Sequence, residues 1–181
     1  AVEGAVIENC TNNVSFDFKA ADPKDILVSI AGIAADVKGL AVTKCTNNAD
    51  VHVKDLANTG NGGKGLQLAG IVGYARAATA VTECTNNGDF SAASGRGGGI
   101  VGTLDGSTVV KCTNNGTIED DKFGQFGGSQ DVYNNKRMGG LVGGTATNEP
   151  GILIENCENH GNVYSQMGCR TGGFVGHCQA T

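Results

Sequence analysis

The sequence contains no tryptophan, only two prolines, and only three tyrosines and six phenylalanines in 181 residues. An ordinary two-layer globular core is built largely from bulky side chains, so this scarcity argues against such a core. Glycine is abundant instead, with 30 residues. This composition indicates a tightly wound backbone.

Several functional signatures are also missing. The chain has 13 Lys and Arg against 18 Asp and Glu, a net charge of −5, and no cluster or stripe of basic residues, which argues against a nucleic-acid-binding protein. It has no run of 18 apolar residues that would insert in a membrane and no signal-peptide pattern. The three histidines are scattered and no CxxC pair occurs, so we expect no structural zinc site. No phosphate-binding GxxxxGK[ST] loop and no D-x-[DN]-x-[DN]-G calcium loop is present.

The chain instead repeats one phrase five times, most clearly as VTECTNNGDF at 81–90 and VVKCTNNGTI at 109–118. Each copy has one cysteine, an apolar residue three positions before it and another six positions after it. The cysteines are Cys10, Cys45, Cys84, Cys112 and Cys157. The residue two positions after each cysteine is an asparagine, namely Asn12, Asn47, Asn86, Asn114 and Asn159.

A second, glycine-rich phrase follows each cysteine: AGIAA from Ala31, AGIVG from Ala69, GGIVG from Gly98, GGLVG from Gly139 and GGFVG from Gly172. Both phrases are short, rich in Val and Ile and bounded by Asn and Gly, which predicts two short β-segments around a polar turn in each repeat. Stacked repeats would bury these apolar positions as continuous columns. We therefore predict an all-β fold, a parallel β-solenoid of about five coils with strands about 4.8 Å apart. It would form a single domain over residues 1–181, uncapped at both ends.

The repeated asparagines and cysteines have two readings each. The asparagines would form either a surface array of amides that binds ice or sugar, or an internal ladder in which each amide bonds to the next copy; we favour the ladder because stacked amides satisfy one another. The cysteines are interpreted as small apolar residues of the interior and not as nucleophiles. Cys169 and Cys178 lie outside the cysteine column. Cys178 aligns with a mostly apolar column of the glycine-rich phrase, and we expect no disulfide between these two residues.

Coil lengths differ because of insertions in one arc of the repeat, at about Asp17–Ile30, His52–Leu68 and Glu119–Arg137. In solenoids such insertions project from one face, which is often the contact face. The third insertion is a candidate contact loop with Phe123, Phe126, Tyr133, Asp120 and Asp121. Its aromatic residues would stack on sugar or anchor a protein partner, and its carboxylates would hold calcium. The alternative is that the loop folds over the rod and buries its own aromatic residues.

The repeat, seen best in GGIVG and STVVKCTNNGTI within 98–118, resembles the GLUG motif, a glycine-rich repeat of bacterial cell-surface proteins that include some immunoglobulin A proteases. The resemblance covers most of the chain. It implies an extracellular location and supplies no catalytic residues. The protease activity itself would need a zinc motif such as HExxH, which this sequence lacks.

These observations lead to one principal hypothesis and two alternatives. The principal hypothesis is a non-enzymatic, extracellular structural or adhesive module, with no cofactor apart from calcium at the contact loop. Along the rod, its partners would be flanking repeats or further copies stacked head to tail into a filament. On its side, it would bind a glycan or a host surface protein. The first alternative is a β-helix enzyme or binding protein that acts on polysaccharides. The second is an ice-binding solenoid, for which the aligned column of Thr11, Thr46, Thr85, Thr113 and Glu158 gives limited support.

Overall fold

The computed structural model describes residues 5–19, 28–54, 66–92, 95–120, 137–146, 150–165 and 170–179. Within these ranges all regular structure is β, and no helix exists that would be long and apolar enough to cross a membrane. The strands form five parallel sheets of five strands each. The chain is therefore a parallel β-solenoid of five coils, as the repeat predicts.

Each coil contributes one strand to each sheet. The first sheet contains β1 (Val6–Glu8), β6 (Ala41–Thr43), β11 (Ala80–Thr82), β16 (Thr108–Val110) and β21 (Leu153–Glu155). The second contains β2 (Thr11–Asn12), β7 (Thr46–Asn47), β12 (Thr85–Asn86), β17 (Thr113–Asn114) and β22 (Glu158–Asn159). The third contains β3 (Phe16–Lys19), β8 (Val51–Lys54), β13 (Phe90–Ala92), β18 (Ile118–Asp120) and β23 (Val163–Tyr164).

The other two sheets are formed by the glycine-rich phrase. The fourth sheet contains β4 (Val28–Ala31), β9 (Leu66–Ala69), β14 (Arg96–Gly98), β19 (Arg137–Gly139) and β24 (Arg170–Gly172). The fifth contains β5 (Ala34–Lys38), β10 (Val72–Arg76), β15 (Val101–Asp105), β20 (Val142–Thr145) and β25 (Val175–His177). The prediction of two β-segments per repeat is wrong in number. Each phrase bends sharply within itself, so that a repeat forms five short strands.

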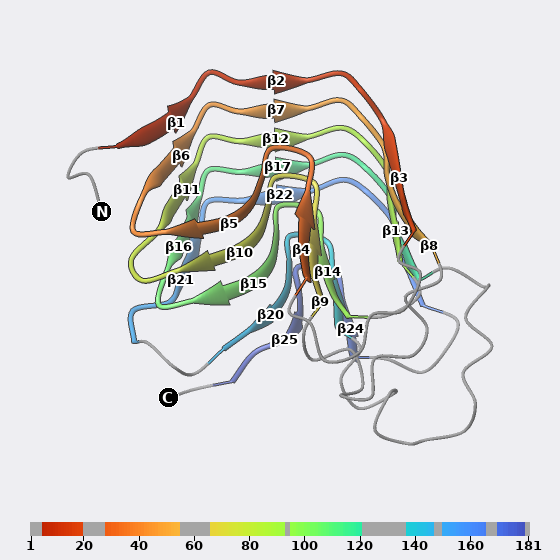
Figure 1. Cartoon of the computed structure of the whole chain (residues 1–181). Coiled ribbons are helices and arrows are strands. Elements are labelled where there is room, and N and C mark those ends of the chain that lie inside the picture. The colour runs from red at the N-terminus through yellow and green to blue at the C-terminus, as the bar shows by residue number, and fades with distance from the viewer. Residues whose placement is uncertain are drawn as a thin grey trace.

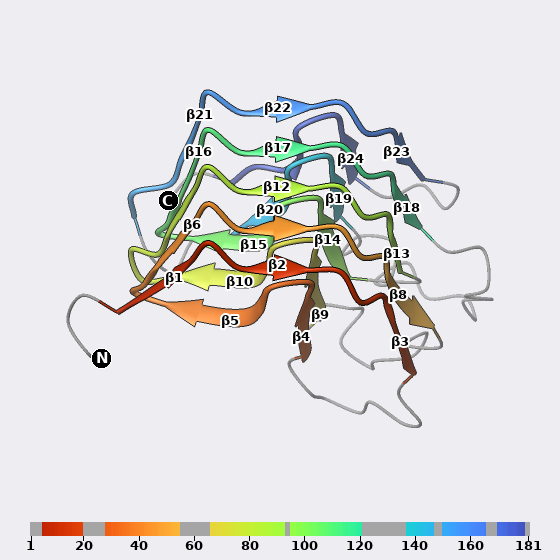
Figure 2. The ribbon, with the colours of Figure 1, turned by 90° about the horizontal axis from the view of Figure 1, so that it is seen from above.

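The path of one coil explains how the sheets lie. The first three strands run around the outside, the fourth turns back toward the middle of the coil, and the fifth leads outward again to the next coil (Figure 1). Viewed at right angles, the coils lie on one another in register from the N-terminal to the C-terminal end (Figure 2). The inward bend between the fourth and fifth strands therefore reaches the interior side of the second sheet.

The corner between the first and second sheets is held by backbone geometry and not by glycine. One residue per coil has a positive φ there: Asn9 (55°), Lys44 (52°), Glu83 (55°), Lys111 (53°) and Asn156 (53°). The amides at these corners still pair with the next coil, as the Lys44 N–H does with the Thr82 carbonyl at 3.0 Å. This local strain is tolerated because every corner is stacked on another of the same shape.

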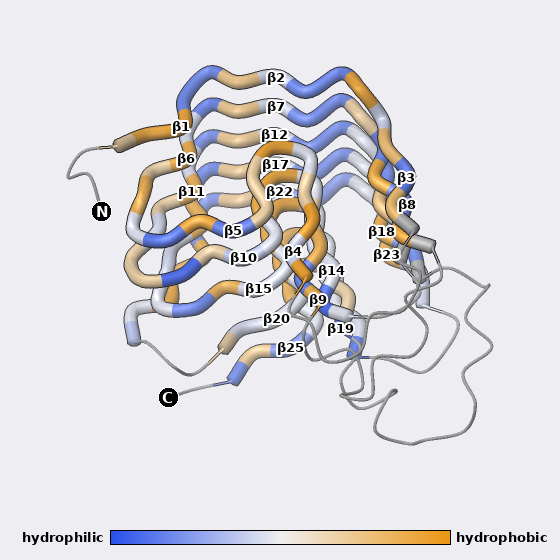
Figure 3. The backbone as a smooth tube through the Cα atoms, in the orientation of Figure 1, coloured by the Kyte–Doolittle hydropathy of each residue, from blue (hydrophilic) through white to orange (hydrophobic). Residues whose placement is uncertain are grey.

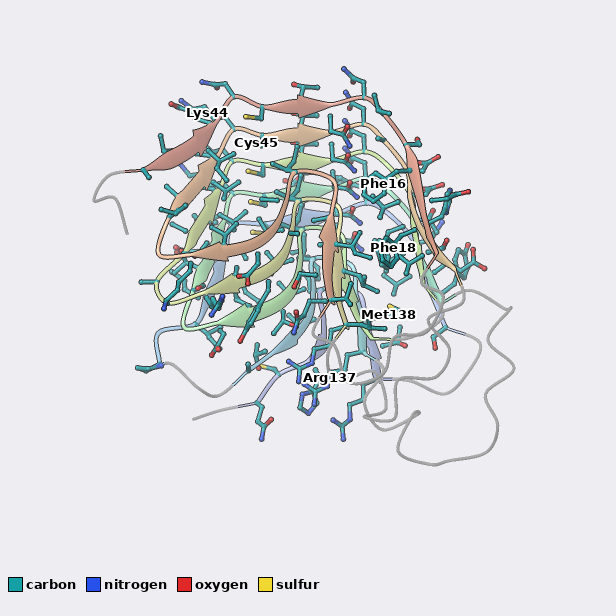
Figure 4. The ribbon with its side chains drawn as sticks, in the orientation of Figure 1. Phe16, Phe18, Lys44, Cys45, Arg137 and Met138 are labelled. Atoms are coloured by element: carbon teal, nitrogen blue, oxygen red, sulfur yellow. The ribbon has the colours of Figure 1, made fainter. Side chains whose placement is uncertain are left out.

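The inward bend divides the interior into two apolar cores. The larger one lies between the first, second and fifth sheets and the bend, and contains buried residues such as Val42, Cys45, Ile71, Leu104 and Val109. The smaller one lies between the third and fourth sheets and contains Ile30, Val51, Leu68, Phe90, Ile118 and Met138. Figure 4 shows Phe16, Phe18 and Met138 on the side of this second core and Cys45 on the side of the first. Each large apolar side chain buried in this way contributes about 1.5–3 kcal/mol.

The insertions fall in the same arc of each coil, as predicted, between the third and fourth sheets (Figure 1). Their predicted boundaries are too wide, because the strands continue into them. β3 extends to Lys19 and β4 begins at Val28, while β8 extends to Lys54 and β9 begins at Leu66. In the third insertion, Glu119 belongs to β18 and Arg137 to β19.

Candidate functional site: the asparagine ladder and the coil ends

The interior asparagine ladder predicted from the sequence is present. The side-chain amide of each rung donates from Nδ2 to Oδ1 of the next: Asn12 to Asn47 at 2.9 Å, and Asn47 to Asn86, Asn86 to Asn114 and Asn114 to Asn159 at 2.8 Å each. The second N–H of a rung donates to the backbone carbonyl two residues later, as Asn86 does to Gly88 at 2.8 Å. The inner rungs are fully buried and fully paired, so the ladder is a continuous, directional chain of hydrogen bonds.

The glycine-rich bend lies directly against this ladder. A methyl group added at Gly70 would overlap Asn86 Oδ1 and the Gly99 carbonyl oxygen. The same relation holds one coil earlier and later, between Gly32 and Asn47, Gly99 and Asn114, and Gly140 and Asn159. The two phrases of the repeat therefore explain each other: the bend requires glycine because an amide of the following coil fills the space of its side chain.

A second asparagine ladder lies on the outer side of the same strands. Asn48 donates to Asn13 at 2.8 Å, Asn87 to Asn48 at 2.7 Å and Asn115 to Asn87 at 2.7 Å. Successive residues of a strand point to opposite sides, which places one asparagine of each pair inside and the next outside. This outer ladder runs in the opposite direction to the inner one, and His160 takes its place in the last coil. The polar segments that flank the second sheet recur in every coil in Figure 3.

The cysteine column behaves as an interior apolar column in the middle coils. Cys45, Cys84 and Cys112 are fully buried, whereas Cys157 is half-buried and Cys10 is exposed, since these last two belong to the end coils. Burial raises the pKa of the Cys45 thiol to about 11. The Cys84 Sγ lies 3.4 Å from the Thr82 carbonyl oxygen and 3.5 Å from that of Val42. A thiol that is closed off from solvent cannot reach a substrate, so the burial of Cys45, Cys84 and Cys112 agrees with the structural interpretation.

The last coil exposes a surface, here called the open face, whose equivalents in the inner coils are covered by the following coil. Gly173 is the fifth glycine of the bend column, and no atom of the described residues lies within 4 Å of the position that a side chain's Cβ would occupy there. The next residue, Phe174, is 51% exposed, whereas its equivalents Ile71, Ile100 and Leu141 are fully buried. Asn159 accepts from Asn114 and donates to the Gly161 carbonyl at 3.0 Å. Its second N–H has no acceptor among the described residues.

The first coil presents the opposite end of the ladder. Asn12 Oδ1 accepts from the Val14 amide at 3.1 Å, whereas Asn47 Oδ1 accepts both from the Ala49 amide at 3.3 Å and from the preceding Asn12 at 2.9 Å. Val14 is 72% exposed, in a column where the next coil has the buried Ala49. Among the described strands, nothing pairs with the outer edges of the first or the fifth coil. For the inner ladder, the first coil is thus the acceptor end and the last coil is the donor end.

Other residues singled out from the sequence have mixed outcomes. Cys178 follows β25 and is free and exposed, because no further coil covers its column, and Cys169 lies outside the described residues. In the candidate contact loop, Asp120 is the last residue of β18, and Asp121, Phe123, Phe126 and Tyr133 lie outside the described residues. The threonine column is in register on the second sheet and ends at Glu158.

The statement that the chain has no basic stripe is wrong for the folded protein. Arg96, Arg137 and Arg170 are 41 and 33 residues apart in sequence, yet they are direct neighbours on β14, β19 and β24. Sequence reasoning missed them because the coils differ in length, so that equal positions in the coils do not recur at equal intervals.

No protein-family model matches the chain, and comparisons with curated proteins and with solved structures give no significant match. The resemblance to the GLUG motif accordingly enters only as support for a proposal.

The two asparagine ladders give a matched pair of variants. Asn86→Leu should destabilise the chain by at least about 1–3 kcal/mol, because Asn47 and Asn114 each lose a partner in the interior. Asn87→Leu, one residue away on the exposed ladder, should change stability by less than about 0.5 kcal/mol. Urea denaturation followed by circular dichroism measures both. Equal effects of the two substitutions would contradict the importance of the inner ladder.

The bend glycines give a second pair. Gly70→Ala should destabilise by about 1–3 kcal/mol or more, because the methyl group meets Asn86 and the Gly99 backbone. Gly173→Ala should leave the stability of the isolated chain nearly unchanged, since its side chain would enter open space. Thermal melting of dilute samples compares them. Similar losses for both would mean that the glycines serve backbone conformation and not the contact with the ladder.

The thiols should differ in reactivity according to their burial. Iodoacetamide should modify Cys10 and Cys178 in the native chain and leave Cys45, Cys84 and Cys112 unmodified until the chain is unfolded. Alkylation of Cys45 should stay slow even as the pH passes 9.0, the ordinary thiol value, because a raised pKa keeps the thiol protonated until about pH 11. Peptide mass spectrometry reports each site. Full labelling of Cys84 in the native chain would contradict a closed core.

Proposed function

We propose that this chain is a non-enzymatic structural module that lengthens coil upon coil, with the first coil of a second copy stacking on its last coil. The single observation that carries this proposal is Gly173, a bend glycine whose side-chain space is empty where every other bend glycine faces an asparagine of the following coil. Glycine loses more conformational entropy on folding than any other residue, so it is unfavourable where nothing requires it. The isolated last coil does not require glycine at position 173, whereas a following asparagine rung would.

The hydrogen-bonding polarity of the ends supports the same arrangement. The N–H of Asn159 that lacks an acceptor among the described residues matches Asn12 Oδ1, whose described donor is the Val14 amide of its own coil. Exposed parallel edges also recruit further strands. The acceptor end and the donor end of the inner ladder join head to tail, and a contact of this kind propagates as a filament and does not close as a pair. Val14 is larger than Ala49, Gly88 and Gly116 in the same column of the inner coils, so the joint has to leave room for its side chain beside the preceding coil.

The proposed setting is the bacterial cell surface, with an adhesive role for the assembled rod. This part of the proposal is supported by the resemblance to the GLUG motif. A role without catalysis is supported by the use of the repeated residues, because the buried asparagines, cysteines and bend glycines are occupied by packing and by hydrogen bonds to one another.

Sedimentation velocity over a range of concentrations, with electron microscopy of the same samples, tests the stacking. The unmodified chain should form rods that lengthen with concentration. Gly173→Leu should stay monomeric with a nearly unchanged melting temperature, because its Cβ meets no described atom within 4 Å and the added side chain extends into the joint. Glu155→Leu, which adds the same side chain on the exposed outer side of the last coil, is the control and should assemble like the unmodified chain.

Two outcomes would overturn the proposal. A monomer at the highest concentration reached would show that a second copy does not occupy the open face. Rods formed equally well by Gly173→Leu would show that the association uses another surface.

A further inference from the structure

The outer side of the fourth sheet carries one column of polar residues along the rod. In register from the first coil to the last, these are Ser29, Gln67, Arg96, Arg137 and Arg170. We call the last three the arginine column. Strand alternation explains why it points away from the second core, because the neighbouring residue Met138 is fully buried in that core. Figure 4 shows Arg137 beyond the fourth sheet, where nitrogen atoms of other side chains gather.

The arginine column faces the fifth sheet, which leaves the bend at an angle to the fourth (Figure 1). Arg137 lies across β20: its Cδ would be 2.9 Å from a methyl group added at Gly144, and its Nη1 is 3.5 Å from the Thr145 carbonyl oxygen. On the strands either side of Gly144, the residues in register are Thr103 and His177. The fold therefore brings together the side of β20 at Gly144 and three residues around it, namely Arg137, Thr103 and His177.

This place contains the unpaired polar atoms of the described interior. In the described part of the chain, the buried side-chain nitrogen and oxygen atoms without a hydrogen-bond partner are Arg137 Nε, Thr103 Oγ1 and His177 Nδ1. Arg137 is only 8% exposed and Thr103 only 1%. Burial of a charged or polar group without a partner is unfavourable, so three such atoms at one place mark a site that is incomplete in the isolated chain.

The charges at this place are mostly positive: burial lowers the pKa of Arg96, and the Asp105 carboxylate on β15 only partly offsets this. Among the described residues, none of the three guanidinium groups of the arginine column forms an ion pair with a carboxylate. Burial, and then the proximity of Arg96 and Arg170, lowers the pKa of Arg137 to about 10. Burial, and then the charges of the three arginines, also lowers the pKa of His177. An anion placed among these groups would relieve both the repulsion and the unpaired donors.

The N-terminal part of the same surface is already neutral. Asp36 and Arg76 form a two-point ion pair with distances of 2.9 and 2.8 Å, and the Arg76 guanidinium lies 5.4 Å from the ring centre of Tyr74. The Tyr74 hydroxyl donates to Asp105 at 2.9 Å. Ser29 donates to Gln67 at 2.8 Å. The positive charge is therefore concentrated at the arginine column.

We propose that the arginine column, with Thr103 and His177, is a binding site for an acidic oligosaccharide that lies along the rod and places a carboxylate or sulfate on successive arginines. Guanidinium groups bind such oxyanions through two parallel hydrogen bonds. The arginines recur at the strand spacing of about 4.8 Å. Linked pyranose rings advance by a similar length, so a sugar chain whose acidic groups are turned to one side would place them at the spacing of the arginines.

Two other polyanions fit this column less well. Residues on one side of an extended acidic peptide recur at about twice 3.3 Å, which does not match the strand spacing. Nucleic-acid binding depends on many phosphate contacts, whereas three arginines on a chain of net charge −5 provide few. The proposal is separate from coil stacking, because the site lies on the side of the rod, and its test uses dilute chain at one fixed concentration.

The test compares ligands first. Isothermal titration calorimetry and thermal melting should show that trigalacturonate or a sulfated trisaccharide binds and stabilises the chain, that maltotriose does not, and that binding weakens with added NaCl. Equal stabilisation by maltotriose would exclude recognition of charge. Equal stabilisation by inorganic sulfate at the same concentration would show that the site binds single ions. Tighter binding of oligothymidylate would show that it binds nucleic acid. Each of these results would overturn the proposal.

The test then compares two arginines. Arg137→Met keeps an unbranched stem and removes the unpaired charge, so it should raise the melting temperature of the unliganded chain and weaken trigalacturonate binding about tenfold or more. Arg76→Met, at the arginine already paired with Asp36, should leave binding unchanged. A lowered melting temperature in Arg137→Met together with unchanged binding would show that the guanidinium is neutralised within the chain and would overturn the proposal.

Discussion

The contact between the inner asparagine ladder and the glycine bend is the constraint on which the rest of the structure depends. Each buried amide fills the space that a side chain on the bend glycine of the preceding coil would occupy. The bend can therefore approach the second sheet closely only if glycine is present, and the amides are excluded from water only if the bend approaches. Because each rung bonds to its neighbours, the contact also fixes the register of one coil on the next.

This contact determines how a chain with so few aromatic residues still forms a core. The bend divides the interior into two narrow cores, each of which can be filled by Val, Ile, Leu and Cys side chains. Phe90 is the largest fully buried residue of the second core, which lies next to the insertions. Stability in such a fold comes mainly from repeated interfaces between coils, so the end coils, which have one neighbour each, expose the columns that the inner coils bury.

The two proposals use different surfaces of one rod. In the first proposal the coil ends are recognised by shape and by the direction of the inner ladder, which the open space at Gly173 and the remaining N–H of Asn159 support. In the second proposal the side of the rod is recognised by charge, since the guanidinium groups of the arginine column form no ion pair with a carboxylate among the described residues. Together they describe a module that extends along its axis and binds an acidic glycan along its flank, which is a combination suited to adhesion.

The sequence by itself determined the fold class, the five coils, and the ladder of Asn12, Asn47, Asn86, Asn114 and Asn159, because a stacked repeat must place the same residue at the same position in each coil. It also placed the insertions in one arc. Only the tertiary structure showed five strands per coil, the opposition of Gly70 and Asn86, and the arginine column. The reason is physical, because contacts across a coil depend on where the backbone bends. The insertions between the third and fourth sheets differ in length, so the sequence spacing does not reveal that the strands bring together Arg96, Arg137 and Arg170.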